Sequence, residues 1–312
     1  MDPIGKSIRK LSGGDFEKRF EALIQDVLRD GRIQAFLTEN KDVTRDQVER
    51  HLSDLFQYKK EWDNCDHCPG LDLCPNLMKG YQPSLSMQRE DIQISYHPCQ
   101  LKRRADERKR QASFIKSLYI PKEIVAVTFD DIDEDNESRI EAIAKAMQFS
   151  HETVPGETGR GLYITGSFGV GKTYLMGAVS NALAEREIES MIIYTPDFFR
   201  ELKQGINDGT YQDKLDMVKR APVLILDDIG AETMSAWVRD DILGALLQYR
   251  MMEKLPTVFT SNYDMNELEA HLSYTNRGGV ENIEELKAKR IMERIRHLNE
   301  EVTMTGENKR RF

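Results

Sequence analysis

The stretch GLYITGSFGVGKTYL, residues 161–175, decides the fold. A short apolar run leads into the pattern G-x-x-x-x-G-K-T, and a helical pattern of apolar residues follows it. This order of strand, glycine loop and helix is the context of a phosphate-binding P-loop. Glycines let backbone N–H groups point at phosphate oxygens, and the helix N-terminus adds its positive dipole end. The stretch therefore predicts a nucleotide site in an α/β domain.

The loop and the first residues of its helix are the expected nucleotide ligands. Lys172 is expected to contact the β- and γ-phosphates of ATP, and the Thr173 hydroxyl to bind Mg²⁺. The full predicted set is Gly166, Ser167, Phe168, Gly169, Val170, Gly171, Lys172, Thr173 and Tyr174.

Two further apolar runs end in polar residues that would complete this site. LILDDIG, residues 224–230, offers Asp227 to the Mg²⁺ ion and Asp228 to the attacking water, which it would orient or deprotonate. Many related ATPases have a glutamate where Asp228 stands, and the shorter side chain predicts weak turnover. TVFTSN, residues 257–262, ends in Asn262, which is expected to contact the γ-phosphate or that water. The alternatives are an acid pair that caps a turn and an asparagine within one.

Arginines near the C-terminus are candidates for sensing the nucleotide. KAKRIMERIRHL, residues 287–298, reads as a helix, on which Arg290 and Arg294 share one face. Arg294 suits a nucleotide-sensing role, and Arg277 suits a finger that reaches into a neighbouring subunit. Surface ion pairing is the alternative for both.

The order of patterns predicts two domains. Apolar runs alternate with helical patterns over residues 129–312, which indicates a parallel sheet flanked by helices. Residues 1–105 read as a mainly helical, zinc-binding domain, with Thr44 and Gln47 as a capping box, and the charged residues 106–128 read as a linker.

All four cysteines lie between Cys65 and Cys99. In a reducing compartment this spacing favours a structural Zn²⁺ site over disulfides. Cys65, Cys68 and Cys99 are the strongest candidate ligands, and the fourth is Cys74 or His97. The alternatives are free buried thiols and a redox-active C-x-x-C pair.

Composition bounds the class of protein. The formal net charge of -9 argues against a protein that coats nucleic acid with a globally basic surface, but not against a local basic groove. The N-terminus has no apolar signal region, and no run of about 18 apolar residues indicates a membrane helix. We expect a cytoplasmic protein with no membrane partner.

Taken together, GSFGVGKTYL, LILDDIG, TVFTSN and KRIMERIR resemble the bacterial replicative helicase loaders of the AAA+ class, and the cysteine segment resembles their Gram-positive primosomal branch. The resemblance implies an ATP-dependent loader, with weak, switch-like ATPase activity, that delivers the hexameric replicative helicase onto single-stranded DNA at the initiation or restart of DNA replication. It implies that the N-terminal domain grips the helicase, that other primosomal proteins take part, and that copies self-associate in the ATP-bound or helicase-bound state.

The resemblance also implies roles for individual residues. Asn262 matches sensor 1, Arg294 sensor 2 and Arg277 the arginine that acts in trans. The family is expected to bind DNA through the helix predicted from YTPDFFRELKQGINDG, residues 194–209. One of two adjacent aromatic rings would stack on a base, while nearby cations meet phosphates. These candidate DNA-binding residues are Phe198, Phe199, Arg200 and Lys203.

Two other functions fit part of the sequence. A transposition-helper AAA+ ATPase would share the nucleotide motifs, but we do not expect the cysteine domain there. A zinc-stabilised adaptor would hold nucleotide only as a structural ligand, and Asp228 in place of glutamate keeps that hypothesis open.

Overall fold

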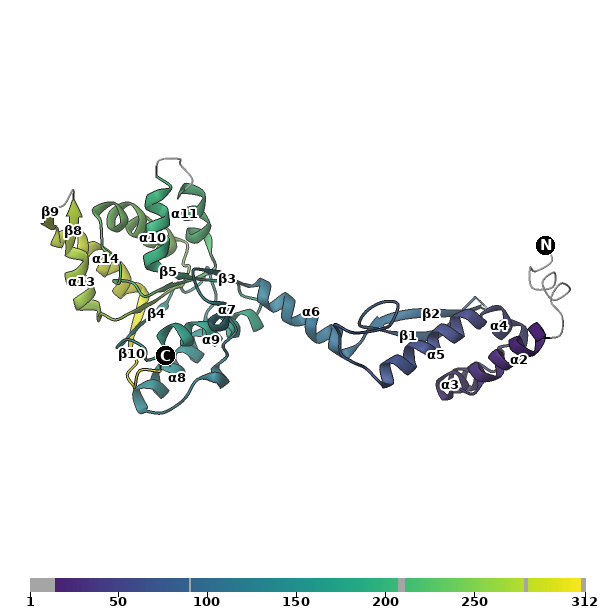
Figure 1. The fold of residues 1–312 in the computed structure, drawn as a ribbon. Helices are drawn as coiled ribbons and strands as arrows, with labels where there is room; N and C mark the ends of the chain where they lie inside the picture. Colours follow the sequence, from purple (N-terminus) through teal and green to yellow (C-terminus); the bar gives the residue numbers. More distant parts are fainter. Residues whose placement is uncertain (1–14, 90, 207–210, 278–279, 310–312) are drawn as a thin grey trace. The chain divides into compact units, whose positions relative to one another are not determined.

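The computed structural model describes residues 15–89, 91–206, 211–277 and 280–309, and the chain forms two compact units that divide between Arg108 and Lys109 (Figure 1). Among its described residues, the first unit combines four complete helices and most of α6 (Gln100–Ser113) with a two-stranded hairpin. The complete elements are α2 (Asp15–Leu28), α3 (Gly31–Glu39), α4 (Arg45–Arg50), α5 (Leu52–Asp66), β1 (Tyr81–Gln88) and β2 (Asp91–Pro98).

Helix caps in this unit follow the sequence pattern. The Thr44 hydroxyl accepts the Gln47 N–H, and the Gln47 side chain accepts the Thr44 N–H, so the predicted capping box is present. The helices pack around a small apolar core that includes Ile24, Leu55 and Ile92.

The antiparallel hairpin β1–β2 was not predicted from the sequence. Its register places Tyr81 opposite Pro98 and Gln88 opposite Asp91. Apolar and polar residues nevertheless alternate in SLSMQ, residues 84–88, and in DIQISY, residues 91–96, which is the pattern of half-buried strands and could have identified the hairpin.

The second unit contains a six-stranded parallel sheet in the order β10-β4-β7-β6-β5-β3. Its strands are β3 (Ile115–Leu118), β4 (Gly161–Thr165), β5 (Ser190–Tyr194), β6 (Val223–Asp227), β7 (Thr257–Ser261) and β10 (Asn299–Thr303). A separate antiparallel pair is β8 (Tyr274–Arg277) with β9 (Val280–Ile283).

Helices cover both faces of this sheet (Figure 1). One face packs against α8 (Glu137–Glu152) and α9 (Lys172–Glu185). The other packs against α10 (Thr195–Gln204), α11 (Tyr211–Arg220), the π-helix η2 (Val238–Leu243), α12 (Gly244–Met252), α13 (Met265–Ser273) and α14 (Glu285–Leu298). The predicted parallel sheet flanked by helices is therefore confirmed.

The central strand β6 explains why four consecutive apolar residues, 223–226, precede Asp227 in the sequence. Leu224 and Leu226 face one core, while Val223 and Ile225 face the other. A parallel strand that is covered on both faces needs an unbroken apolar run rather than an alternating one.

The stretch assigned to a linker, residues 106–128, contains regular structure. It holds the end of α6 (Gln100–Ser113), the edge strand β3 and the short helix α7 (Lys122–Val125). The 3₁₀ turn η1 (Phe129–Asp131) follows directly. Because Ile115–Leu118 pairs with β5, the second unit begins earlier in the chain than the sequence suggested. None of the described helices is long and apolar enough to cross a membrane.

Arg250, on α12, ties the amino ends of two central strands to the helices. Its fully buried guanidinium donates to the Thr257 hydroxyl at 2.8 Å and to the carbonyl oxygens of Ala221 and Pro256 at 2.7 and 2.5 Å. Without the side chain, the Ala221 carbonyl oxygen and the Thr257 hydroxyl would lose this donor. The Pro256 carbonyl oxygen would keep the Leu224 N–H at 3.1 Å.

We therefore expect Arg250→Met to lower the free energy of unfolding by about 3 kcal/mol, because it removes the buried donor of the Ala221 carbonyl oxygen and of the Thr257 hydroxyl. Urea unfolding measures this change. The exposed Arg200 on α10 provides the control, since Arg200→Met should change stability by less than about 0.5 kcal/mol. Equal effects of the two substitutions would contradict the role given to Arg250.

Candidate nucleotide site

A cavity of about 510 Å³ lies at the carboxyl ends of β4, β6 and β7, where an open parallel sheet binds its ligands. Predicted site residues make up much of its wall: Phe168, Gly169, Gly171, Lys172, Thr173, Tyr174, Asp227, Asp228 and Asn262. The structure thus brings together three segments that are far apart in the sequence.

The P-loop joins β4 to α9 through glycines in left-handed conformations. Gly169 has φ +78°, and a β-carbon there would lie 1.9 Å from the Asn308 side chain. Gly171 has φ +99° and precedes the first residue of α9. Residues with side chains rarely adopt such angles, so the loop requires glycine at both positions.

Lys172 points its ammonium group back over the loop. Nζ donates to the carbonyl oxygens of Gly166 at 2.7 Å and Ser167 at 3.0 Å, and to Asn262 Oδ1 at 2.8 Å. The side chain is buried. A cation held at the mouth of a glycine loop is placed to meet phosphate oxygens.

Asp227 is a buried carboxylate with two hydroxyl donors. Thr173 Oγ1 donates to its Oδ2 at 2.9 Å, and Thr260 Oγ1 donates to its Oδ1 at 2.7 Å. Burial raises the pKa of Asp227 to about 6, although both hydroxyl groups oppose the rise. A hard cation suits this oxygen-rich, negatively charged position, so these residues fit Mg²⁺.

Asp228 is joined to Lys172 through Asn262. The Asn262 amide accepts from Lys172 with its oxygen and donates to Asp228 Oδ1 at 2.8 Å with its nitrogen. The Asp228 N–H donates to Thr260 Oγ1 at 2.8 Å, and Asp228 has φ +59°, which is uncommon for a residue with a side chain. The arrangement holds the carboxylate over the cavity at the cost of backbone strain.

Sequence reasoning missed several residues at this cavity. Arg139 is buried, donates to the Val170 carbonyl oxygen at 2.8 Å and lines the wall, yet no motif marks it. Thr260 could have been found, because it lies on β7 two residues before Asn262. The remaining lining residues outside the predicted set are Ile124, Asp131, Asp133, Tyr194 and Lys309.

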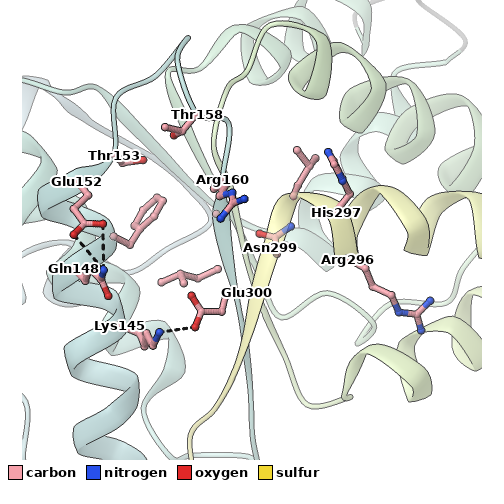
Figure 2. A pocket seen from close by; sticks show the side chains of 14 residues that line it. Lys145, Gln148, Glu152, Thr153, Thr158, Arg160, Arg296, His297, Asn299 and Glu300 are labelled. Carbon is pink, nitrogen blue, oxygen red and sulfur yellow. Dashed lines mark hydrogen bonds and ion pairs between the residues drawn. The ribbon is translucent and has the colours of Figure 1, made fainter.

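A second cavity of about 550 Å³ lies at the amino ends of β4 and β10 (Figure 2). Lys145 pairs there with Glu300 at 2.5 Å, and the Gln148 amide donates to Glu152. It has no glycine loop, so we assign the nucleotide to the carboxyl-end cavity.

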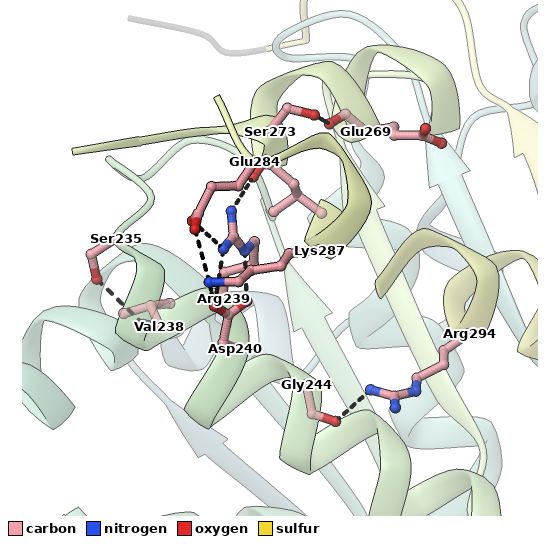
Figure 3. A network of polar contacts seen from close by, with 11 residues as sticks. Ser235, Val238, Arg239, Asp240, Gly244, Glu269, Ser273, Glu284, Lys287 and Arg294 are labelled. Atoms are coloured by element: carbon pink, nitrogen blue, oxygen red, sulfur yellow. Dashed lines mark hydrogen bonds and ion pairs between the residues drawn. The ribbon is translucent and has the colours of Figure 1, made fainter. Parts of the chain in front are cut away.

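The predicted sensor arginine lies away from the nucleotide cavity. Arg294 donates to the Gly244 carbonyl oxygen at 3.0 Å (Figure 3) and is not among the residues that line that cavity. Its neighbour on the helix, Arg290, is exposed. The backbone of Arg277 ends β8, and its side chain lies outside the described residues.

The prediction that Phe198 or Phe199 stacks on a base is corrected by the structure. Both rings are buried, with 0% and 1% exposure, and pack in the core beneath α10. The helix turns adjacent residues about 100° apart, but α10 is covered widely enough to bury both. Arg200 and Lys203 are exposed, and Arg200 pairs with Asp197 at 2.9 Å.

The cysteines are free thiols whose sulfurs accept hydrogen bonds. The Asn76 amide donates to Cys65 Sγ, the Gly80 N–H to Cys74 Sγ and the Lys102 N–H to Cys99 Sγ, each at 3.4 Å. Burial raises the pKa of the Cys65 thiol. Among the residues that the structure describes, no group of three or more His, Cys, Asp or Glu side chains is arranged to hold a metal ion, so the predicted zinc is not confirmed. His97 is exposed on β2.

Comparison with known proteins covers both units. The family model "Primosomal protein DnaI N-terminus" matches residues 1–96, and "IstB-like ATP binding protein" matches residues 101–311. The replicative helicase loader DnaI of Bacillus subtilis (strain 168) is 43% identical over 99% of both chains.

Solved structures agree for the second unit. A DnaI crystal structure is 49% identical and superposes with a TM-score of 0.55, covering 64% of this chain and all of that one. The crystal structure of the DnaC helicase loader is 27% identical, with a TM-score of 0.51, and covers 59% of this chain and 99% of that one.

We expect Asp227→Asn to stabilise the nucleotide-free protein while abolishing Mg²⁺-dependent nucleotide binding. At pH 7 the wild-type carboxylate is ionised inside the protein, whereas the amide is neutral, accepts from one hydroxyl with its oxygen and donates to the other with its nitrogen. The gain should be about 3 kcal/mol, the equivalent of a rise in pKa from 3.8 to about 6, measured by thermal unfolding.

The stability difference between Asp227→Asn and the wild type depends on pH. The folded-state pKa is raised, so ionisation costs stability only as the pH rises from the ordinary value of 3.8 to about 6. The advantage of Asp227→Asn should therefore appear over that interval and stay constant above it. An advantage that grows at lower pH would contradict the burial of this charge.

Proposed function

The chain belongs to the DnaI family of replicative helicase loaders, and we propose that it is an ATP-controlled loader that delivers the hexameric replicative helicase onto single-stranded DNA. The similarity across the whole chain carries this proposal. It includes the N-terminal unit, which the DnaI-specific model matches and which a transposition helper built on the nucleotide motifs alone does not require.

The ATPase activity that we propose is weak and serves as a switch. Lys172 binds the β- and γ-phosphates, while Thr173 and Asp227 hold Mg²⁺, which when bound supplies positive charge beside the reacting phosphate. Asp228 orients the attacking water, and Asn262 sets the position of that carboxylate. Because Asp228 is one methylene shorter than glutamate, we expect its reach to the water to depend on rearrangement by a partner.

Arginines would complete the site between copies of the chain. Arg294 does not line the cavity of its own chain, which supports a role toward a neighbour's nucleotide rather than the sensing role in cis. Arg277 is the second candidate. We propose that self-association in the ATP-bound or helicase-bound state brings such an arginine to the γ-phosphate.

For single-stranded DNA we propose contacts to the phosphate backbone. Arg200 and Lys203 are exposed on α10, and cations of this kind bind phosphates without base stacking. The buried Phe198 and Phe199 instead fix the helix that carries them.

We also propose that the cysteine segment binds structural Zn²⁺. Hydrogen bonds from N–H groups to sulfur favour the thiolate form that zinc requires. Cys74 Sγ accepts such a hydrogen bond, as Cys99 Sγ does, whereas His97 is exposed on β2, which supports Cys74 over His97 as the fourth ligand.

Metal analysis of the purified chain tests the zinc proposal. We expect about one Zn²⁺ per chain, retained in His97→Ala and lost in Cys74→Ser. A zinc-free wild-type chain would refute a structural zinc, and the reverse pattern in the two variants would make His97 the ligand.

The N-terminal unit offers an apolar surface to the helicase. Leu73 and Leu77 are 73% and 76% exposed in the cysteine segment, with Met78 and Leu101 also exposed. We propose this segment as the helicase contact because two leucines four residues apart in the chain are both largely exposed.

We expect Leu73→Glu combined with Leu77→Glu to weaken binding to a Gram-positive replicative helicase at least about tenfold, because charge replaces buried apolar contact. Size-exclusion chromatography with light scattering, with ATP or ADP, reads the complex directly. Leu286→Glu changes a leucine of similar exposure on α14 and should leave binding unchanged.

The same experiment tests the loader function itself. Failure of the wild-type chain to co-elute with the helicase under any nucleotide would count against the loader. Full binding by the double variant would count only against this surface.

A further inference from the structure

The chain does not end at the edge of the sheet but runs back across the P-loop. We name residues 304–309, which follow β10, the C-terminal strap. Met304 is buried and its N–H donates to the Thr165 carbonyl oxygen at 2.7 Å, just before the loop. The Lys309 N–H donates to the Gly169 carbonyl oxygen at 2.9 Å, within the loop.

The start of α8 fixes the middle of the strap. Ser138 Oγ donates to the Thr303 carbonyl oxygen at 2.7 Å and accepts the Thr305 N–H at 3.1 Å. The Asn136 amide donates to the Thr305 carbonyl oxygen at 3.2 Å. Backbone contacts on both sides therefore place the strap, so the position of Lys309 does not depend on its side chain alone.

The Lys309 side chain lines the nucleotide cavity and holds two acids. Nζ lies 2.5 Å from Asp135 Oδ2 and 3.3 Å from Asp133 Oδ2. The ammonium group lowers the pKa of the Asp135 carboxyl below its ordinary value. Asp133 also lines the cavity, as does Asp131, whose carboxylate accepts the Thr128 N–H at 2.8 Å.

The charge balance of the cavity depends on this lysine. Among the described residues, its wall carries three basic side chains, Arg139, Lys172 and Lys309, against four carboxylates, Asp131, Asp133, Asp227 and Asp228. Mg²⁺ would offset Asp227. Without Lys309, the unbalanced acids near the α8 end would face an incoming nucleoside triphosphate, itself a polyanion, and would repel it.

We propose that Lys309 is a further nucleotide-binding residue, which the C-terminal strap carries to the cavity to neutralise Asp133 and Asp135. This inference rests on the proposed ATP site and adds to it a cation that no nucleotide motif contains. The strap makes the last described residues of the chain part of the ATP site.

The test measures the affinity and dissociation rate of a fluorescent ATP analogue with Mg²⁺ in the full-length chain. Lys309→Ala should weaken binding about fivefold, and the loss should shrink as salt shortens the Debye length. Lys309→Arg should bind as the wild type does. Lys309→Ala combined with Asp133→Asn and Asp135→Asn should recover most of the affinity, because the acids that need neutralising are gone.

Lys145 provides a matched control (Figure 2). It pairs with Glu300 at 2.5 Å and is 35% exposed, against 2.5 Å and 36% for Lys309, but it lies at the other cavity. Lys145→Ala should leave nucleotide binding unchanged. Thermal unfolding of each variant shows whether it is folded, and Asp133→Asn with Asp135→Asn alone should bind nucleotide at least as tightly as the wild type.

The outcomes separate this inference from the proposed function. A wild-type chain that binds no nucleotide would overturn the ATP site itself. A wild-type chain that binds, with Lys309→Ala unchanged or no weaker than Lys145→Ala, would overturn the role of Lys309. If Asp133→Asn and Asp135→Asn do not restore the affinity that Lys309→Ala loses, then Lys309 only holds the strap in place. That result would overturn the neutralising role.

Discussion

The buried carboxylate of Asp227 is the constraint on which the site depends. A charge in the core is costly unless hydrogen bonds and a cation compensate it. Thr173 donates to it from the P-loop helix and Thr260 donates to it from β7. The hydrogen bonds that compensate the charge therefore also join α9, β6 and β7. The hydroxyl of Thr260 then accepts the Asp228 N–H, and Asn262 links Asp228 to Lys172. In the function that we propose, metal binding, phosphate binding and water positioning would therefore belong to one hydrogen-bonded network, so that occupancy of the site would affect each part.

We propose that the two units divide the work of a loader. The unit of residues 109–312 contains the nucleotide site at the strand ends of a sheet that is covered on both faces. Packing on both faces holds the strands, and thus the site residues, in fixed positions. The unit of residues 1–108 has a small core and leaves leucines exposed in the cysteine segment. An exposed apolar surface on a protein with net charge -9 suits a specific protein partner better than nucleic acid.

Local patterns made much of the site predictable. The spacing around Lys172 and the acids after an apolar run follow from backbone geometry, and the sheet brings them together as expected. Two features depend on tertiary packing and could not be predicted from local patterns. Phe198 and Phe199 are both buried because several helices cover α10, and Lys309 reaches the cavity only because β10 runs beside β4.

Single-turnover ATP hydrolysis tests the central claim most directly, namely that this network is a partner-controlled switch. The rate would be measured for the chain alone, with the replicative helicase, and with helicase and single-stranded DNA together. The account predicts slow hydrolysis alone, faster hydrolysis with partners, and loss of that increase in Asp228→Ala. Hydrolysis near zero under every condition would contradict it and would identify the nucleotide as a structural ligand of an adaptor.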